Sequence, residues 1–297
     1  MTTRKPWHGV MVATALPFRE DLSVDYDRYA EHVRGLVDAG CDGVCPNGSL
    51  GEYQTLTDEE RARVVRTAVE AVGGDRVMPG AGAYGSAESR RWAEQAREAG
   101  ASSVLLLPPN AYRADERTVE AHYAEVAKAG LPIVAYNNPH DTKVDLTPEL
   151  LARLHAAGLI AAVKEFSGDV RRAYRIAELA PGLDVLAGAD DVLLELVLAG
   201  AKGWVAGYPN ALPKASVALY RAAAAGDLER ALPLYRALHP LLRWDSRTEF
   251  VQAIKLSMDL MGAYGGPCRH PRLPLAAEQD KAVRAATGNA AHLESDA

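Results

Sequence analysis

Short apolar segments recur along the first three quarters of this chain, and helical segments lie between them. Each apolar segment is nearly continuous in apolar residues, which is typical of strands that are covered on both faces. Strands that alternate with helices in this way predict an α/β fold. Because an open doubly wound sheet has about five or six strands, eight strands favour a closed (β/α)8 TIM barrel. The eight predicted strands are residues 10–14, 43–46, 77–81, 103–107, 133–136, 160–164, 184–187 and 203–206.

Glycine closes the helical segments. A glycine just past a helix end adopts the left-handed conformation that stops the helix at little cost. One helix, residues 58–72, also has a start signal, because Thr57 followed by Glu60 predicts a capping box. The repetition indicates a helix-to-strand joint that is used many times. The six predicted closing glycines are Gly40, Gly100, Gly130, Gly158, Gly182 and Gly200.

The strand pattern stops near the end of the third quarter of the chain. We therefore predict a barrel over residues 1–225 and a C-terminal helical region over residues 226–297. In that region we expect helices interrupted at Pro233 and Pro240, then a loop over 265–274, an alanine-rich helix and a loose polar tail.

Charge and hydropathy narrow the class of partner. The 297 residues include 33 Lys and Arg against 39 Asp and Glu, a net charge of −6, which disfavours a nucleic-acid binder and favours a small-molecule ligand. No apolar run approaches the roughly 18 residues of a membrane span, and no signal-peptide segment opens the chain. We therefore expect a cytoplasmic protein without a membrane partner.

Neither a disulfide framework nor a metal centre is predicted. Cys41, Cys45 and Cys268 are too few for a disulfide scaffold, and we interpret them as reduced, buried thiols. The eight histidines lack metal-site spacing, and neither a phosphate loop nor a G-x-S-x-G elbow occurs. We therefore expect no metal and no cofactor.

Lys164 ends an apolar strand, whereas the other lysines stand in polar or helical contexts. Its amine should emerge at the mouth of the barrel, where barrel enzymes bind their substrates. Burial disfavours the ammonium form, so we expect a lowered pKa and an amine that forms a Schiff base with a carbonyl. A structural ion pair with Glu165 is the alternative, but successive strand residues point to opposite faces.

Tyr136 ends the strand that precedes the strand of Lys164. Consecutive strands are neighbours in a barrel, so the phenol should lie close to Lys164 and move protons there. Taken alone, a tyrosine at a strand end is more often a packing residue with a satisfied hydroxyl. The predicted adjacency to Lys164 favours a catalytic role.

A glycine-rich loop follows the second predicted strand. Gly48 and Gly51 flank Ser49 and Leu50, so successive backbone N–H groups can point into the barrel mouth and bind a carboxylate. An ordinary glycine turn is an equally good interpretation of this loop.

One motif supports a rival class, an NAD-dependent oxidoreductase. Residues 80–85 follow a predicted strand, open a helix and match the dinucleotide fingerprint G-x-G-x-x-G. That fingerprint also needs an acidic residue about 20 positions further on, at the end of the next strand. Here the next strand ends in Leu107 and Pro108, so we interpret the glycines as part of a barrel loop.

Three motifs occur in a fixed order along the chain: Gly48-Ser49-Leu50-Gly51-Glu52, Tyr136-Asn137-Asn138-Pro139 and Lys164-Glu165-Phe166-Ser167-Gly168-Asp169. With them, the chain resembles the dihydrodipicolinate synthase and N-acetylneuraminate lyase family of Schiff-base (β/α)8 enzymes over about residues 7–275. The resemblance implies that Lys164 forms the imine, that Tyr136 shuttles protons and that the Ser49 and Leu50 backbone holds a 2-oxo-acid carboxylate. It also implies a homotetramer, and it places Gly188, Asp190 and Val205 along the pocket.

Three positions depart from the pattern of the dihydrodipicolinate synthases. Those enzymes carry threonine at position 50, tyrosine at about position 111 and arginine at position 141, where this chain has Leu50, Ala111 and Asp141. Leucine cannot relay a proton from Tyr136. Asp141, in the pocket position of the arginine, would repel a second substrate carboxylate. These departures disfavour a role in lysine biosynthesis.

Other segments are similar to the branch that contains 1-pyrroline-4-hydroxy-2-carboxylate deaminase. We therefore expect a lyase or deaminase that acts on a 2-oxo acid or a cyclic imine acid, with that pyrroline as the first candidate. The alternatives are a pyruvate-dependent aldolase, a keto-sugar-acid dehydratase or aldolase, a dihydrodipicolinate synthase paralogue and, further off, a non-catalytic small-molecule binder. The similar segments are residues 108–115, 136–139, 167–172, 203–205 and 251–256.

Overall fold

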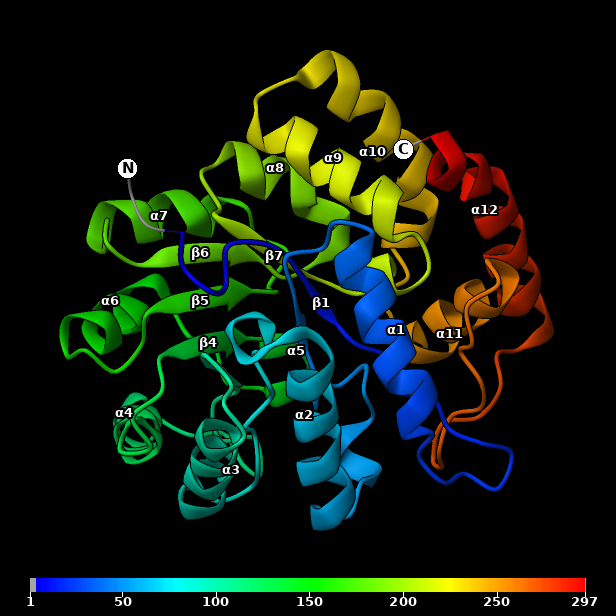
Figure 1. Cartoon of the computed structure of the whole chain (residues 1–297). Coiled ribbons are helices and arrows are strands. Elements are labelled where there is room, and N and C mark those ends of the chain that lie inside the picture. The colour runs from blue at the N-terminus through cyan, green and yellow to red at the C-terminus, as the bar shows by residue number, and fades with distance from the viewer. Residues whose placement is uncertain (1–3, 297) are drawn as a thin grey trace.

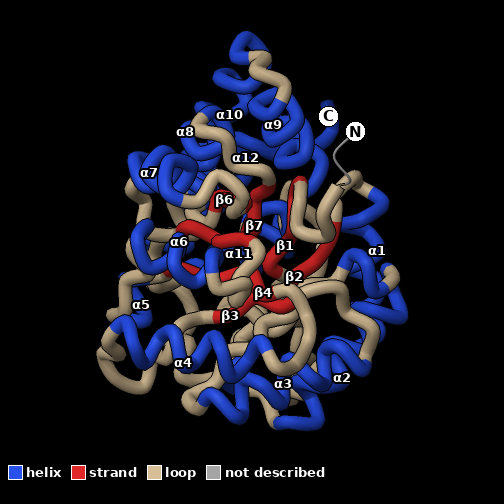
Figure 2. The backbone as a smooth tube through the Cα atoms, turned by 90° about the vertical axis from the view of Figure 1, so that its left-hand side faces the viewer, coloured by secondary structure: helices blue, strands red, loops and turns tan. Residues whose placement is uncertain are grey.

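A computed structural model describes residues 4–296. Its strands form one parallel sheet in the order β2-β1-β7-β6-β5-β4-β3, curved into a nearly closed barrel with helices around the outside (Figures 1 and 2). The TIM-barrel prediction is therefore confirmed. The strands are β1 (Gly9–Ala13), β2 (Gly43–Cys45), β3 (Val104–Leu106), β4 (Ile133–Asn137), β5 (Ala162–Glu165), β6 (Asp184–Ala187) and β7 (Gly203–Ala206).

The third predicted strand, residues 77–81, is not a regular strand among the described residues. It is an extended segment between β2 and β3, joined to them by single bridges from Val77 to Val44 and from Gly80 to Leu105. Pro79 lies in the middle of it and has no N–H to donate to a ladder. The prediction of eight strands is wrong by this one, although the segment still closes the gap in the barrel.

Helices follow most of the strands and cover the barrel. The capping box is confirmed, because the Thr57 hydroxyl accepts the N–H of Glu60 and the Glu60 carboxylate accepts the N–H of Thr57. The barrel helices are α1 (Tyr26–Asp38), α2 (Asp58–Val72), α3 (Ser86–Glu98), α4 (Glu116–Ala127), α5 (Pro139–Thr142), α6 (Pro148–Ala156), α7 (Arg171–Leu179), α8 (Leu193–Leu198) and α9 (Pro213–Ala224), with short 3₁₀ turns η1 (Tyr53–Thr55), η2 (Gly74–Arg76), η3 (Asp190–Val192) and η4 (Tyr208–Asn210).

The predicted glycine stops are confirmed at five of the six positions. Gly182 is the exception, because α7 ends earlier, with Ala180 as its C-cap residue, and Pro181 separates the two. The φ of Gly182 lies outside the left-handed region. Among the six predicted stops, the glycines with positive φ are Gly40, Gly100, Gly130, Gly158 and Gly200.

Three further helices follow the barrel: α10 (Leu228–Leu242), α11 (Phe250–Leu260) and α12 (Ala277–Asp296). The predicted interruptions at Pro233 and Pro240 are wrong, because α10 continues through both. Its apolar face is buried, and this packing outweighs the hydrogen bonds that the prolines remove. The loop predicted over 265–274 is present.

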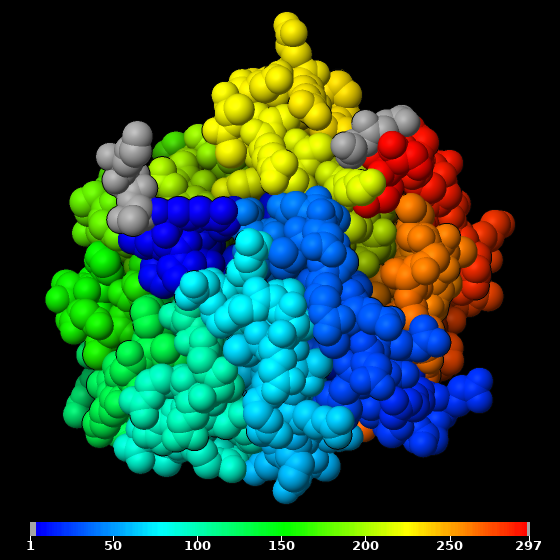
Figure 3. Space-filling view, in the orientation of Figure 1, coloured from blue at the N-terminus to red at the C-terminus, as the bar shows by residue number. Residues whose placement is uncertain are grey.

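The loose tail is also a wrong prediction, since residues up to 296 are helical. The Glu294 carboxylate accepts the backbone N–H groups of Lys214 and Ala215 at the start of α9, both at 3.0 Å. A carboxylate is favourable at a helix N-terminus because the free N–H groups and the helix dipole point there. Figure 3 shows α9 and α10 in yellow beside α12 in red, on one side of the molecule.

The barrel interior is filled by its own apolar cluster. Its members Cys45, Leu105 and Tyr136 reach the carboxyl ends of the strands, where they line a cavity. The interior residues are Trp7, Met11, Cys45, Met78, Leu105, Val134, Tyr136, Ala162, Leu186 and Val205.

None of the helices within residues 4–296 combines the length and apolar character needed to cross a bilayer.

Candidate active site

A cavity of about 900 Å³ opens at the carboxyl ends of the strands. Lys164 of β5 and Tyr136 of β4 lie in its wall, together with the loop after β2 and residues that precede α11. In a barrel of parallel strands this is the end at which loops from different strands converge. The structure therefore brings the predicted catalytic residues together in one space.

Lys164 and Tyr136 are direct neighbours across the sheet. They are paired in the register of β4 and β5, and the Lys164 Nζ lies 4.2 Å from the centroid of the Tyr136 ring. Only 6% of Lys164 is exposed. The Phe166 ring is 5.5 Å away on the same wall, so the amine is enclosed by aromatic carbon.

Glu165 points away from this amine, toward the other face of the strand. Its carboxylate accepts hydrogen bonds from the Asn137 side chain at 3.1 Å and from the Ser167 N–H at 2.7 Å, and it pairs with Arg172 at 3.2 Å. An ion pair between Lys164 and Glu165 is therefore not what holds the lysine.

The electrostatic surroundings of Lys164 correct one expectation. Burial lowers the pKa of the amine, but the acidic groups around it, first Tyr136 and then Asp245, outweigh burial and raise that pKa above its ordinary value. The predicted lowering is wrong because it weighed burial alone and left out the acidic groups near the amine, of which Tyr136 is the larger cause and Asp245, which the sequence pattern did not reveal, the second. The amine therefore rests as an ammonium and must lose a proton before it can attack a carbonyl.

Tyr136 is a phenol that stays protonated. Burial raises its pKa, opposed by the positive charge of Lys164. The Asn138 amide lies 3.4 Å from the phenol oxygen and donates to it. The phenol proton is thus available for transfer to a group bound at Lys164.

The loop after β2 has an unusual backbone. Asn47 and Glu52 both have positive φ, 57° and 53°, so the loop folds sharply at each end of the Gly48–Ser49–Leu50–Gly51 segment. Ser49 and Leu50 line the cavity. Within the described chain, no protein acceptor takes the N–H of either residue. This geometry favours the anion-binding interpretation over an ordinary turn.

The other predicted binding residues are placed differently. Asp141 of α5 lines the cavity and accepts a hydrogen bond of 2.8 Å from the Asn138 amide. Gly188, Asp190 and Val205 are not among the residues that line it. A Cβ at Gly188 would lie 2.5 Å from the Glu165 carbonyl oxygen, and Val205 belongs to the interior cluster.

Asp190 is a buried bracing residue. Its carboxylate accepts the Trp204 indole N–H at 2.8 Å and the N–H groups of Gly207 and Tyr208, each at 3.1 Å. Burial raises its pKa to about 6, although these donors act in the opposite direction. The residue thus fixes the turn that leads from β7 into η4.

Sequence reasoning missed the part of the wall that comes from the C-terminal region. Asp245, Arg247 and Arg272 line the cavity, and Lys143, which follows α5, lines it as well. The pattern gave no signal for the C-terminal residues, because their position depends on how the segments between α10 and α11 and between α11 and α12 fold back over the barrel.

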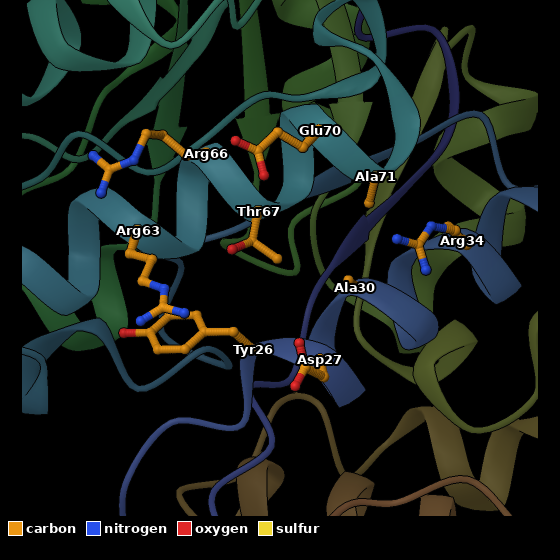
Figure 4. A pocket seen from close by; sticks show the side chains of 9 residues that line it. All are labelled: Tyr26, Asp27, Ala30, Arg34, Arg63, Arg66, Thr67, Glu70 and Ala71. Atoms are coloured by element: carbon orange, nitrogen blue, oxygen red, sulfur yellow. The ribbon is translucent and has the colours of Figure 1, made fainter.

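A smaller hollow of about 350 Å³ lies between α1 and α2, on the outer side of the barrel. Figure 4 shows Arg63 over the Tyr26 ring and Arg34 across the hollow from it, so the cationic groups do not converge on one point. None of its lining residues lies in the large cavity.

Residues 4–296 contain no group of three His, Cys, Asp or Glu side chains placed to hold a metal ion.

Comparison with known proteins agrees with this geometry. The model of the dihydrodipicolinate synthetase family matches residues 6–290. The chain belongs to this family. Its members are class I lyases that act through a lysine Schiff base, and this chain is an enzyme of that class.

Relatives within the family carry names of two kinds. A protein named 4-hydroxy-tetrahydrodipicolinate synthase from Methanothrix thermoacetophila is 34% identical, over 94% of this chain and 95% of its own length. A DapA-like lyase from Halobacterium salinarum is 35% identical, over 89% and 88%. The crystal structure of dihydrodipicolinate synthase from Aquifex aeolicus superposes with a TM-score of 0.89 at 29% identity, over 94% of this chain and 96% of that one.

Of the three cysteines, Cys41 and Cys45 are buried free thiols, as predicted. Cys268 is wrong in one respect, since it is only half-buried. It lies in the loop between α11 and α12, where fewer layers of chain cover it than cover the barrel strands.

Proposed function

We propose that Lys164 is the imine-forming lysine and that the substrate is 1-pyrroline-4-hydroxy-2-carboxylate. The observation that carries the proposal is the buried Lys164 amine, 4.2 Å from the Tyr136 ring in the wall of the cavity. An amine held beside a phenol in this way has a nucleophile and a proton-transfer group in contact.

The substrate carboxylate is assigned to the loop after β2. The N–H groups of Ser49 and Leu50 suit an anion, since they have no acceptor in the described chain. Leu50 contributes no hydroxyl, and Asp141 disfavours a second carboxylate close to Asn138. A substrate with one carboxylate and an uncharged ring fits these features.

The reaction follows from attack of the Lys164 nitrogen on C2 of the cyclic imine. The ring nitrogen leaves C2 with a proton, so the ring opens and the Lys164 imine forms. Loss of a C3 proton gives an enamine, which expels the 4-hydroxyl as water, and a proton shift moves the double bond to C5 and its nitrogen. Hydrolysis at C5 releases ammonia, and hydrolysis at C2 frees Lys164. The sum is pyrroline plus water to 2-oxoglutarate semialdehyde plus ammonia.

The purified enzyme should release one ammonia per 1-pyrroline-4-hydroxy-2-carboxylate consumed, without pyruvate. Coupled assays for ammonia and pyruvate measure both products in one reaction. Pyruvate from a keto-sugar acid, with no ammonia from the pyrroline, would contradict the deaminase and assign an aldolase reaction to the same lysine.

The width of the cavity favours a second candidate, a keto-sugar-acid aldolase or dehydratase. Its volume of about 900 Å³ exceeds what a five-membered ring fills, and the side chains of Asn110, Ser246 and Thr248 in its wall can form hydrogen bonds with sugar hydroxyls. Arg247 and Arg272 also supply positive charge in that wall, so a second acidic group is not excluded everywhere in the cavity. A turnover screen should therefore include pyrrolines, keto-sugar acids, and pyruvate with aldehydes, the last of which also tests the dihydrodipicolinate synthase alternative.

Tyr136→Phe should lower kcat by a factor of about 100 to 10,000 while the imine still forms. The ring and its packing on Lys164 remain, and only the proton-transfer group is lost. Turnover is measured together with borohydride trapping of the imine. Unchanged kcat would remove Tyr136 from the proton path.

The homotetramer implied by the family resemblance stays a prediction, which light scattering tests.

A further inference from the structure

Asp245 lines the same cavity as Lys164, although it belongs to the segment between α10 and α11. It is 9% exposed, so the carboxyl group is held inside the protein. The chain makes room for it at Gly207, where a Cβ would lie 2.6 Å from the Asp245 Oδ1. A glycine at the end of β7 therefore lets this carboxyl approach the barrel axis.

The charges around Asp245 favour its neutral form. Burial, together with the negative charge of Asp190, raises the pKa of Asp245 well above the usual value for a carboxyl, while Lys164 acts in the opposite direction. Asp190 has three N–H donors that stabilise its anion. Of the two carboxyls, Asp245 is therefore the one that takes up a proton more readily, and the proton that the Lys164 ammonium loses before it attacks moves to it.

Lys164 therefore shares the cavity wall with two groups that can carry a proton. Tyr136 approaches it from β4, and Asp245 approaches from the side of β6 and β7, where Gly207 and Asp190 lie. Imine formation needs a proton at the atom that leaves C2, at the moment when the lysine nitrogen forms its double bond. The two groups can therefore serve as separate proton donors, one for imine formation and one for the later proton transfers at carbon.

We propose that Asp245 is a catalytic acid that protonates the group leaving C2 as the Lys164 imine forms. In the neutral adduct, Lys164 nitrogen and the leaving oxygen or nitrogen are both bonded to C2. The Asp245 proton moves to the leaving atom, the bond from C2 to that atom breaks, and the lone pair of the Lys164 nitrogen forms the C=N bond. Water or an amine departs, and the Asp245 carboxylate faces the positively charged iminium.

This role rests on the imine proposed above for Lys164, but not on the pyrroline as substrate. The test therefore uses pyruvate, a plain 2-oxo acid, and follows the rate at which borohydride traps the reduced adduct on the Lys164 peptide. Asp245→Asn keeps the shape of the side chain and removes its acidic proton. Trapping should become about 100-fold slower. Asp27→Asn, an exposed position on the outer face of α1, should trap at the wild-type rate.

Chemical rescue separates proton donation from packing. Asp245→Ala leaves a space beside Gly207, and added formate should restore a substantial part of the trapping rate there, with no effect on Asp245→Asn, whose amide fills that space. Thermal unfolding of both variants records their folding. Wild-type rates in Asp245→Asn, or slow trapping in Asp245→Ala that formate does not change, would overturn the role of Asp245. An adduct on Lys164 with no ammonia from the pyrroline would instead overturn the proposed substrate and leave Asp245 in place.

Discussion

Lys164→Arg should abolish turnover while the chain still folds. The guanidinium stays charged at every accessible pH and cannot become the nucleophile, so kcat should fall by a factor on the order of 10⁴ to 10⁶. A positive charge remains beside Tyr136 and Asp245, which keeps the electrostatic balance of the wall. Borohydride with pyruvate should add the reduced adduct to the Lys164 peptide of the wild type and to no peptide of the variant.

Lys128→Arg is the matched control. Lys128 is exposed beyond the end of α4, where it pairs with Glu125, so the same substitution there should leave turnover unchanged. An adduct that forms on another lysine, or activity that survives in Lys164→Arg, would contradict the mechanism. Circular dichroism of both variants shows whether a loss of activity comes from misfolding instead of from the missing amine.

The fold was largely predictable because its strands are buried on both faces. Continuous apolar segments between glycine-stopped helices identify such strands without any knowledge of their partners. Residues 77–81 fit that pattern and still failed as a regular strand, because Pro79 lacks a donor. The apolar pattern reports burial, whereas a regular ladder also requires an N–H at each position.

The centre of the site was predictable for a topological reason. Strands that follow one another are adjacent in a barrel, so Tyr136 and Lys164 had to meet, and they are paired in the register. Asp245 follows no such rule. It reaches the site from a segment between two outer helices, and that placement depends on tertiary packing alone. The direction of the Lys164 pKa was wrong partly for this reason, since Asp245 adds to the larger effect of Tyr136.

A buried ion pair joins the loop after β2 to the C-terminal region. The Lys255 Nζ of α11 lies 2.9 Å from the Glu52 Oε1, and the two side chains are 2% and 0% exposed. The other Glu52 oxygen accepts the Arg269 N–H at 2.9 Å, and Lys255 also donates to the Pro267 carbonyl at 2.8 Å. Two of these three contacts converge on Glu52, the residue that ends the Ser49–Leu50 turn.

Lys255→Met should destabilise the protein by about 3 to 5 kcal/mol, because it leaves the Glu52 charge buried without its partner. Urea unfolding measures the free energy of unfolding. Lys281→Met, at an exposed position on α12, is the matched control and should lie within about 0.5 kcal/mol of wild type. A loss in Lys255→Met no larger than in this control would contradict the importance of the pair.

The double variant Glu52→Gln with Lys255→Met tests the physical cause. If the uncompensated charge is responsible, removing the carboxylate as well should recover part of the lost stability, so the two effects should not add.

The folded fraction of Lys255→Met should also show a raised KM for the substrate with a smaller change in kcat. That split is expected because Glu52 holds the turn whose N–H groups are assigned to the carboxylate, while Lys164 and Tyr136 lie on strands that the pair does not touch.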